Sequence, residues 1–135
     1  MFIATGDVFV PHLVLEYSHN LTHTFDSEKL LLALHQEVVS SELFAVDDIH
    51  VRSQDYHQYL VGGRLVSFVH LAVVVEPRHD FGEKKRLANA LLAVLASTFP
   101  TVTHVDVEMR EAEHSCVGQR RVSLQAVDKE RVYCN

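Results

Sequence analysis

Three kinds of residue in this sequence could do chemistry: a proline at the head of a strand-like segment, ten histidines and two cysteines. Pro11 heads the segment Pro-His-Leu-Val-Leu-Glu-Tyr-Ser over residues 11–18. A proline nitrogen is a basic amine only when it is the amino terminus of the chain. Residues 1–10 stand in front of Pro11 and therefore decide whether its nitrogen has any chemistry.

The histidines form no convincing metal-binding motif. His19 and His23 have a four-residue spacing that suits a metal pair on a helix, but the segment 18–23 is typical of a loop. No third ligand follows at a suitable spacing, so we expect no metal. His70 lies inside an apolar strand-like run, and we expect it to be a hydrogen-bonded core or interface residue.

Composition indicates one ordinary globular domain, or one protomer of an oligomer, with 135 residues and 47% hydrophobic residues. The net charge of −6 argues against nucleic-acid binding. No apolar run approaches the roughly 18–20 residues of a membrane span, and the start lacks the features of a signal peptide. We therefore expect a cytoplasmic protein without a membrane partner, in which Cys116 and Cys134 are free thiols.

The first half of the chain predicts a strand, a helix and a second strand. Apolar and polar residues alternate from Pro11 to Tyr17, which is typical of a half-buried strand that begins at the proline. A helix is expected from the cap at Asp26 or Ser27 to about Leu43, because leucines recur at helical spacing between them. The second strand begins near residue 49.

The second half repeats this order after a hairpin. Gly62-Gly63 predicts a two-residue turn. An apolar strand follows over 68–75, then a helix from about Gly82 to just before Pro100, then a strand over 104–110. The polar tail contains one more strand-like piece at 122–124.

This order predicts an α/β (α+β) protomer of the form β-α-β-β-α-β, made of two similar halves. Right-handed crossovers place both helices on the same face of a four-stranded mixed sheet. The opposite face is then bare, and a run as apolar as 68–75 is expected to be covered by partner subunits.

The segment 11–18, followed by Asn20-Leu21, resembles the start of mature 5-carboxymethyl-2-hydroxymuconate isomerases in its Pro-His…Val-x-Glu-x-Ser-x-Asn pattern. Phe-Val-His-Leu at 68–71, with Arg78 in the loop beyond, resembles the third strand of that family. The resemblance extends over about 11–110 and places the chain in the tautomerase superfamily. It implies a homotrimer without a cofactor that isomerises a small anionic unsaturated 2-oxo or 2-hydroxy acid in aromatic-compound degradation.

In that superfamily the proline is the first residue after the initiator methionine is removed, so Pro11 matches the catalytic base. Arginines of the family hold substrate carboxylates and stabilise oxyanion charge. Residues 49–52 match the family's Ile-Arg-x-Arg pattern but read Ile-His-Val-Arg, and a gapless match over 68–99 puts His79 rather than Arg78 at the other arginine position. The expected substrate contacts are Arg52 and Arg78, with His50 and His79 as lesser candidates.

The ten residues before Pro11 leave two interpretations open. In the first interpretation, translation of the natural protein starts at Val10, because valine is the residue that a GTG start codon encodes when it is read as internal. Removal of the initiator methionine then exposes Pro11 as the amino terminus. Alternatively, residues 1–10 are real and the protein is a non-catalytic trimeric binding protein that keeps the fold. We favour the first interpretation and treat 11–135 as the tautomerase-like domain.

Overall fold

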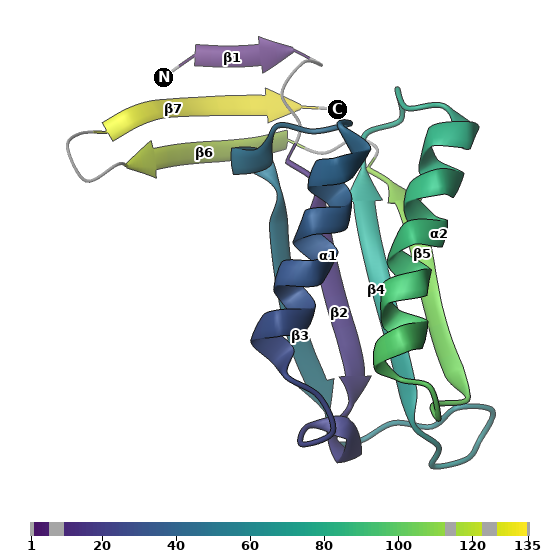
Figure 1. The fold of residues 1–135 in the computed structure, drawn as a ribbon. Coiled ribbons are helices and arrows are strands. Elements are labelled where there is room, and N and C mark those ends of the chain that lie inside the picture. Colours follow the sequence, from purple (N-terminus) through teal and green to yellow (C-terminus); the bar gives the residue numbers. More distant parts are fainter. Residues whose placement is uncertain (1, 6–9, 113–115, 123–126, 135) are drawn as a thin grey trace.

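This computed structural model describes residues 2–5, 10–112, 116–122 and 127–134, and these form two sheets and two long helices (Figure 1). The elements in chain order are β1 (Phe2–Thr5), β2 (His12–Ser18), the 3₁₀ turn η1 (His19–Leu21), α1 (Ser27–Ser41), the 3₁₀ turn η2 (Val46–Asp48), β3 (His50–Tyr56), β4 (Phe68–Val75), α2 (Phe81–Thr98), β5 (His104–Glu111), β6 (Cys116–Val122) and β7 (Val127–Cys134).

The larger sheet has the strand order β3-β2-β4-β5. β2 runs parallel to β3 and antiparallel to β4, and β4 runs parallel to β5. Both helices lie on one face of this sheet (Figure 1). The predicted β-α-β-β-α-β protomer with a four-stranded mixed sheet is therefore confirmed.

Both helices begin where side chains satisfy their first backbone N–H groups. The Asp26 carboxylate accepts a hydrogen bond from the Lys29 backbone N–H at 3.2 Å, which starts α1 at the predicted position. Asp80 and Glu83 form a reciprocal capping box at the start of α2. Each helix buries one leucine-rich stripe against alternate residues of β2 and β4, which forms the core. The buried stripe residues are Leu30, Leu34 and Val38 of α1 and Leu87, Leu91 and Leu95 of α2.

The face of the sheet opposite the helices is more polar than the sequence predicted. Alternation in β4 places Val69, Leu71, Val73 and Val75 in the core, so only four residues of that run, at 68, 70, 72 and 74, lie on the open face. Their cross-strand neighbours on β2, β3 and β5 are mostly charged or histidine residues. Neither α1 nor α2 covers this face, as predicted, but the apolar run divides between the two faces, so only part of it lies on the open one.

The loop between β3 and β4 contains the predicted glycine turn. Val61 and Arg64 pair through two backbone hydrogen bonds of 2.8 and 3.1 Å. Gly62 and Gly63 lie between them with φ of 58° and 76°, a conformation that glycine adopts without steric cost. The Gly62-Gly63 turn is confirmed, although β3 itself ends earlier, at Tyr56.

The chain termini form a second sheet that sequence reasoning did not find. β6 and β7 pair as an antiparallel hairpin, and β1 pairs parallel with β7. Of the predicted strand at 122–124, Val122 ends β6 and the other two residues lie outside the described part of the chain. Cys116 and Cys134 are opposite each other in this hairpin and form a disulfide, so the prediction of two free thiols is wrong in this structure.

Neither α1 nor α2, the two long helices among the described residues, is long and apolar enough to cross a membrane.

The buried stripe of α1 predicts that two of its leucines contribute very differently to the free energy of unfolding. Leu34 is fully buried in the core, whereas Leu32 is 68% exposed. We expect Leu34→Ala to lower the free energy of unfolding by about 3 kcal/mol, because it removes buried methyl groups and leaves a cavity. Leu32→Ala should change it by less than about 0.5 kcal/mol. Urea denaturation measures both values, and equal losses would contradict this packing.

Candidate active site

Pro11 lies at the end of the central strand, where β2 begins. Its carbonyl accepts a hydrogen bond from the His50 backbone N–H at 3.1 Å, which extends the parallel ladder between β2 and β3 by one residue. The Pro11 side chain is fully buried. Val10 is 2% exposed and packs against Val74, Ala112 and Val117. With Val10 attached, the Pro11 nitrogen is an amide and carries no basic lone pair.

Beside Pro11, the open face of the sheet carries a cluster of three basic side chains: His12, His50 and Arg52. The register pairs His12 with His50, and their ring centroids are 5.2 Å apart. Arg52 Nη1 lies 3.2 Å from His12 Nδ1. A guanidinium only donates hydrogen bonds, so His12 Nδ1 must be the acceptor and His12 is neutral in this contact.

Electrostatics at this cluster favours anions. Burial lowers the pKa of His12 below its ordinary value of 6.5, and the charge of Arg52 and then that of His50 lower it further. Both charge effects are those of positive groups close to the His12 ring, which directly follows Pro11. A positive potential attracts carboxylates and also disfavours protonation of any amine placed there.

Arg78 and His79 lie at the same end of the sheet, in the loop that follows β4. Arg78 forms an ion pair with the carboxylate of Glu76, which is only 4% exposed, so part of its charge is already compensated. The His79 ring packs edge-on against Phe44 at 5.0 Å. Its Nε2 is buried and has no hydrogen-bond partner within the described part of the chain.

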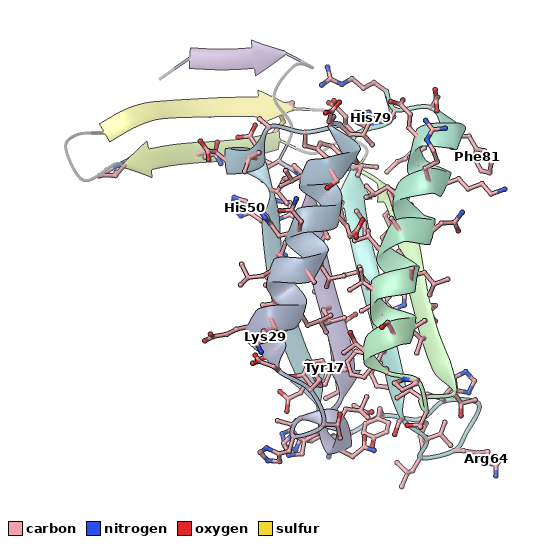
Figure 2. All side chains as sticks on the ribbon, viewed as in Figure 1. Tyr17, Lys29, His50, Arg64, His79 and Phe81 are labelled. Atoms are coloured by element: carbon pink, nitrogen blue, oxygen red, sulfur yellow. A yellow bond between two sulfur atoms is a disulfide. The ribbon has the colours of Figure 1, made fainter. Side chains whose placement is uncertain are left out.

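The structure thus brings all five predicted site residues to one end of the sheet but divides them. His50 and Arg52 lie on the open face, whereas His79 contacts the loop after α1, on the helix side. Figure 2 shows His50 and His79 at this end of the molecule and Tyr17 near the opposite end. Pro11 directly precedes β2, a central strand of the sheet whose two faces carry these two groups.

Sequence reasoning missed His12 and Arg110 as neighbours of this site. Both lie on the open face and belong to one cross-strand row. The order of this row is His50, His12, Val74, Arg110. Arg110 Nε donates to both carboxylate oxygens of Glu108, at 2.7 and 3.0 Å. Strand alternation alone would have placed His12 on the polar face, but the proximity of Arg110 depends on the pairing of β4 with β5.

The opposite end of the open face holds a separate hollow of about 350 Å³, lined by both aromatic and titratable side chains. Within it, the Tyr56 hydroxyl donates to Glu16, and this hydrogen bond is the main reason that the pKa of Tyr56 is raised. The His70 ring forms a hydrogen bond with Asp106, which confirms the expectation that His70 is hydrogen-bonded. Glu16 lies five residues along β2 from Pro11, and His70 is its cross-strand partner on β4. This hollow is therefore not part of the surroundings of Pro11.

A mixed four-stranded sheet with two helices on one face and a proline at the head of the central strand defines a protein of the tautomerase fold. A family model described as 5-carboxymethyl-2-hydroxymuconate isomerase matches residues 11–115, well over half of the chain. The chain belongs to that family. No curated protein sequence matches it.

Solved structures agree with this assignment. A 5-carboxymethyl-2-hydroxymuconate isomerase from Deinococcus radiodurans R1 is 27% identical, with a TM-score of 0.69 over 77% of this chain and 84% of that one. A 5-carboxymethyl-2-hydroxymuconate delta-isomerase is 15% identical, with a TM-score of 0.64 over 76% and 82%. A fused 4-OT symmetric trimer is 18% identical, with a TM-score of 0.65 over 75% and 85%. At such identities the last two show the fold alone.

The environment of His12 predicts a pH dependence of stability. Its pKa in the folded chain is lower than the ordinary value of 6.5, so the unfolded chain takes up this proton first as the pH falls. The free energy of unfolding should therefore decrease as the pH falls through about 6.5. We expect this decrease, measured by urea denaturation between pH 7.5 and 5, to be smaller in His12→Gln than in the unsubstituted chain. An equal or steeper decrease in His12→Gln would contradict the assignment.

Proposed function

We propose that the natural protein is an isomerase that moves a proton along an unsaturated 2-oxo or 2-hydroxy acid, and that it acts as a chain beginning at Pro11. Membership of the family supports an isomerase, and the proposal adds the class of substrate on which it acts. The observation that carries it is the position of Pro11 at the end of the central strand, next to the basic cluster of His12, His50 and Arg52. A role in aromatic-compound degradation is the corresponding biological setting.

The proposed proton transfer needs only a basic amine and positively charged side chains. A free Pro11 nitrogen is a secondary amine whose pKa, near ~8 for an α-amino group, is lowered by the positive potential of the cluster. It takes a proton from the enol of a 2-hydroxydienoate and returns a proton to a carbon further along the conjugated system. The product is the 2-oxo isomer, and no electron acceptor or cofactor takes part.

Arg52 is the main candidate for binding the substrate carboxylate. It is exposed on the open face and donates a hydrogen bond to neutral His12, a contact that leaves the positive charge of Arg52 uncompensated. His50, in register with His12, adds a second donor.

Arg78 and His79 have a different place in the proposal. Glu76 already neutralises part of the charge of Arg78, so Arg78 contributes less to carboxylate binding. The buried Nε2 of His79 lacks a partner within the described residues, and a buried polar atom without a partner costs free energy. Because His79 contacts Phe44 on the helix side, away from the basic cluster, it stays a lesser candidate for contact with the substrate.

The proposal requires that residues 1–10 be absent from the active chain. Val10 occupies a buried position among Val74, Ala112 and Val117, directly next to the Pro11 nitrogen. Its peptide bond removes the basic lone pair, and its side chain fills space beside the nitrogen. Initiation at Val10 followed by removal of methionine would correct both effects.

We also propose a homotrimer. The fused 4-OT structure, which shares the fold, is described as a symmetric trimer. A partner subunit would cover the open face and complete the surroundings of Pro11. Sedimentation of the chain beginning at Pro11 should give three times the mass of one protomer, and a monomer would contradict this part of the proposal.

A non-catalytic trimeric binding protein is the second candidate. The observation that favours it is the buried Val10, which is well packed where a substrate would approach the nitrogen. Such a protein would bind an anionic ligand through Arg52 without isomerising it.

The activity test compares two chains. A chain that starts at Pro11, made by trimming a Met-Pro11 start, should catalyse enol–keto conversion of an arylpyruvate. The long chain and Pro11→Ala in the short chain should both be at least about 100-fold slower, because each removes the proton-transfer group. Ultraviolet absorbance of the enol measures kcat/KM. If the short chain is as inert as the long one, or if Pro11→Ala changes nothing, the proline mechanism is wrong.

The substrate-binding assignment predicts an order among arginine substitutions in the short chain. Arg52→Gln should lower kcat/KM by roughly 10- to 100-fold, as expected for the loss of a charge-assisted hydrogen bond of about 1.5–3 kcal/mol. Arg78→Gln should have a smaller effect. Arg64→Gln is the matched control, because Arg64 is exposed in the glycine turn at the far end of the molecule (Figure 2). An effect of Arg64→Gln as large as that of Arg52→Gln would contradict the assignment.

A further inference from the structure

The end of the sheet opposite Pro11 brings together three potential metal ligands that are far apart in sequence: His19, Asp55 and His57. The parallel register of β2 and β3 pairs Tyr17 with Asp55 and ends at the next pair of residues. His19 and His57 directly follow the two strand ends and therefore occupy equivalent positions. Sequence reasoning considered His19 only together with His23 and expected no metal, because the proximity of Asp55 and His57 to His19 depends on the β2–β3 register.

The three side chains are arranged around a small common space. Asp55 Oδ2 lies 2.5 Å from His19 Nδ1 and 3.6 Å from His57 Nε2. The two imidazole rings stack with centroids 3.8 Å apart and an interplanar angle of 26°. One ligand atom from each residue lies within 4.8 Å of the others.

These distances are close to those of a tetrahedral zinc site. Bonds of about 2.0–2.1 Å to nitrogen and oxygen place neighbouring ligand atoms about 3.4 Å apart. The Asp55–His57 separation already matches this value. The Asp55–His19 separation must increase by about 1 Å, which side chains with exposures of 35% and 47% can accommodate by small rotations.

We propose that His19, Asp55 and His57 form a binding site for a divalent transition-metal ion of the zinc type. Two imidazoles and one carboxylate suit such an ion, whereas calcium and magnesium prefer sites made entirely of oxygen ligands. Three protein ligands leave a fourth position for water or for a donor from another molecule. The ion would join the turn after β2 to the end of the edge strand β3.

The site is independent of the proposed isomerase chemistry. Pro11 and His19 lie at opposite ends of β2, which at about 3.3 Å per residue places them roughly 25 Å apart. The ion therefore contributes no ligand or charge to the proton transfer at Pro11. Loss of the metal should leave the activity of the short chain unchanged.

The test is calorimetric titration of the full chain, with its disulfide intact, with zinc chloride alone. We expect one zinc ion per chain. His57→Ala and Asp55→Asn should each weaken binding at least about tenfold, since even changes to groups that only support metal ligands cost that much. His23→Ala is the matched control, because His23 is an exposed histidine close in sequence to His19 and outside the cluster. Its affinity should equal that of the unsubstituted chain.

Two further measurements make the outcome specific. Cobalt(II) should bind in place of zinc and give the visible absorption of a four-coordinate ion, which His57→Ala should abolish, and calcium should not bind. Thermal unfolding without metal should be the same for all variants, which shows that each still folds. The proposal is overturned if zinc does not bind at one ion per chain, or if His57→Ala and His23→Ala bind zinc equally.

Discussion

The position of β2 between two other strands is the constraint on which the rest of the structure depends. β2 is paired along its whole length with β3 on one side and over most of it with β4 on the other. Alternate residues of β2 enter the core under both helices. The residue before β2, Pro11, is consequently fixed at one end of the sheet, and the residue after it, His19, is fixed at the other.

This geometry gives the two ends of the strand different chemistry. At the Pro11 end, His12 is neutral and is flanked by His50 and Arg52, so the surroundings attract anions and disfavour protonation of an amine. Whether an amine is present depends on a single covalent bond, the peptide bond from Val10. Under the proposed mechanism, the same scaffold would be a proton-transfer enzyme in the chain that begins at Pro11 and at most an anion-binding protein in the longer chain.

The sequence predicted the fold more completely than the site. Helix caps such as Asp26, apolar stripes and strand alternation are local signals, and they identified the β-α-β-β-α-β core correctly. The disulfide between Cys116 and Cys134 and the grouping of His19 with Asp55 and His57 depend on strand pairing, which local patterns do not specify. The resemblance located the proline and the basic residues, but only the structure showed that Glu76 pairs with Arg78 and that Arg52 donates a hydrogen bond to His12.

The central claim is that the functional chain begins at Pro11, and the mass of the protein made from its native gene tests it most directly. Intact-mass and amino-terminal mass spectrometry of that protein should give a chain that starts at Pro11 with a free secondary amine. A chain that starts at Met1 or Phe2 would contradict the claim, because its Pro11 nitrogen is an amide that no neighbouring charge can make basic.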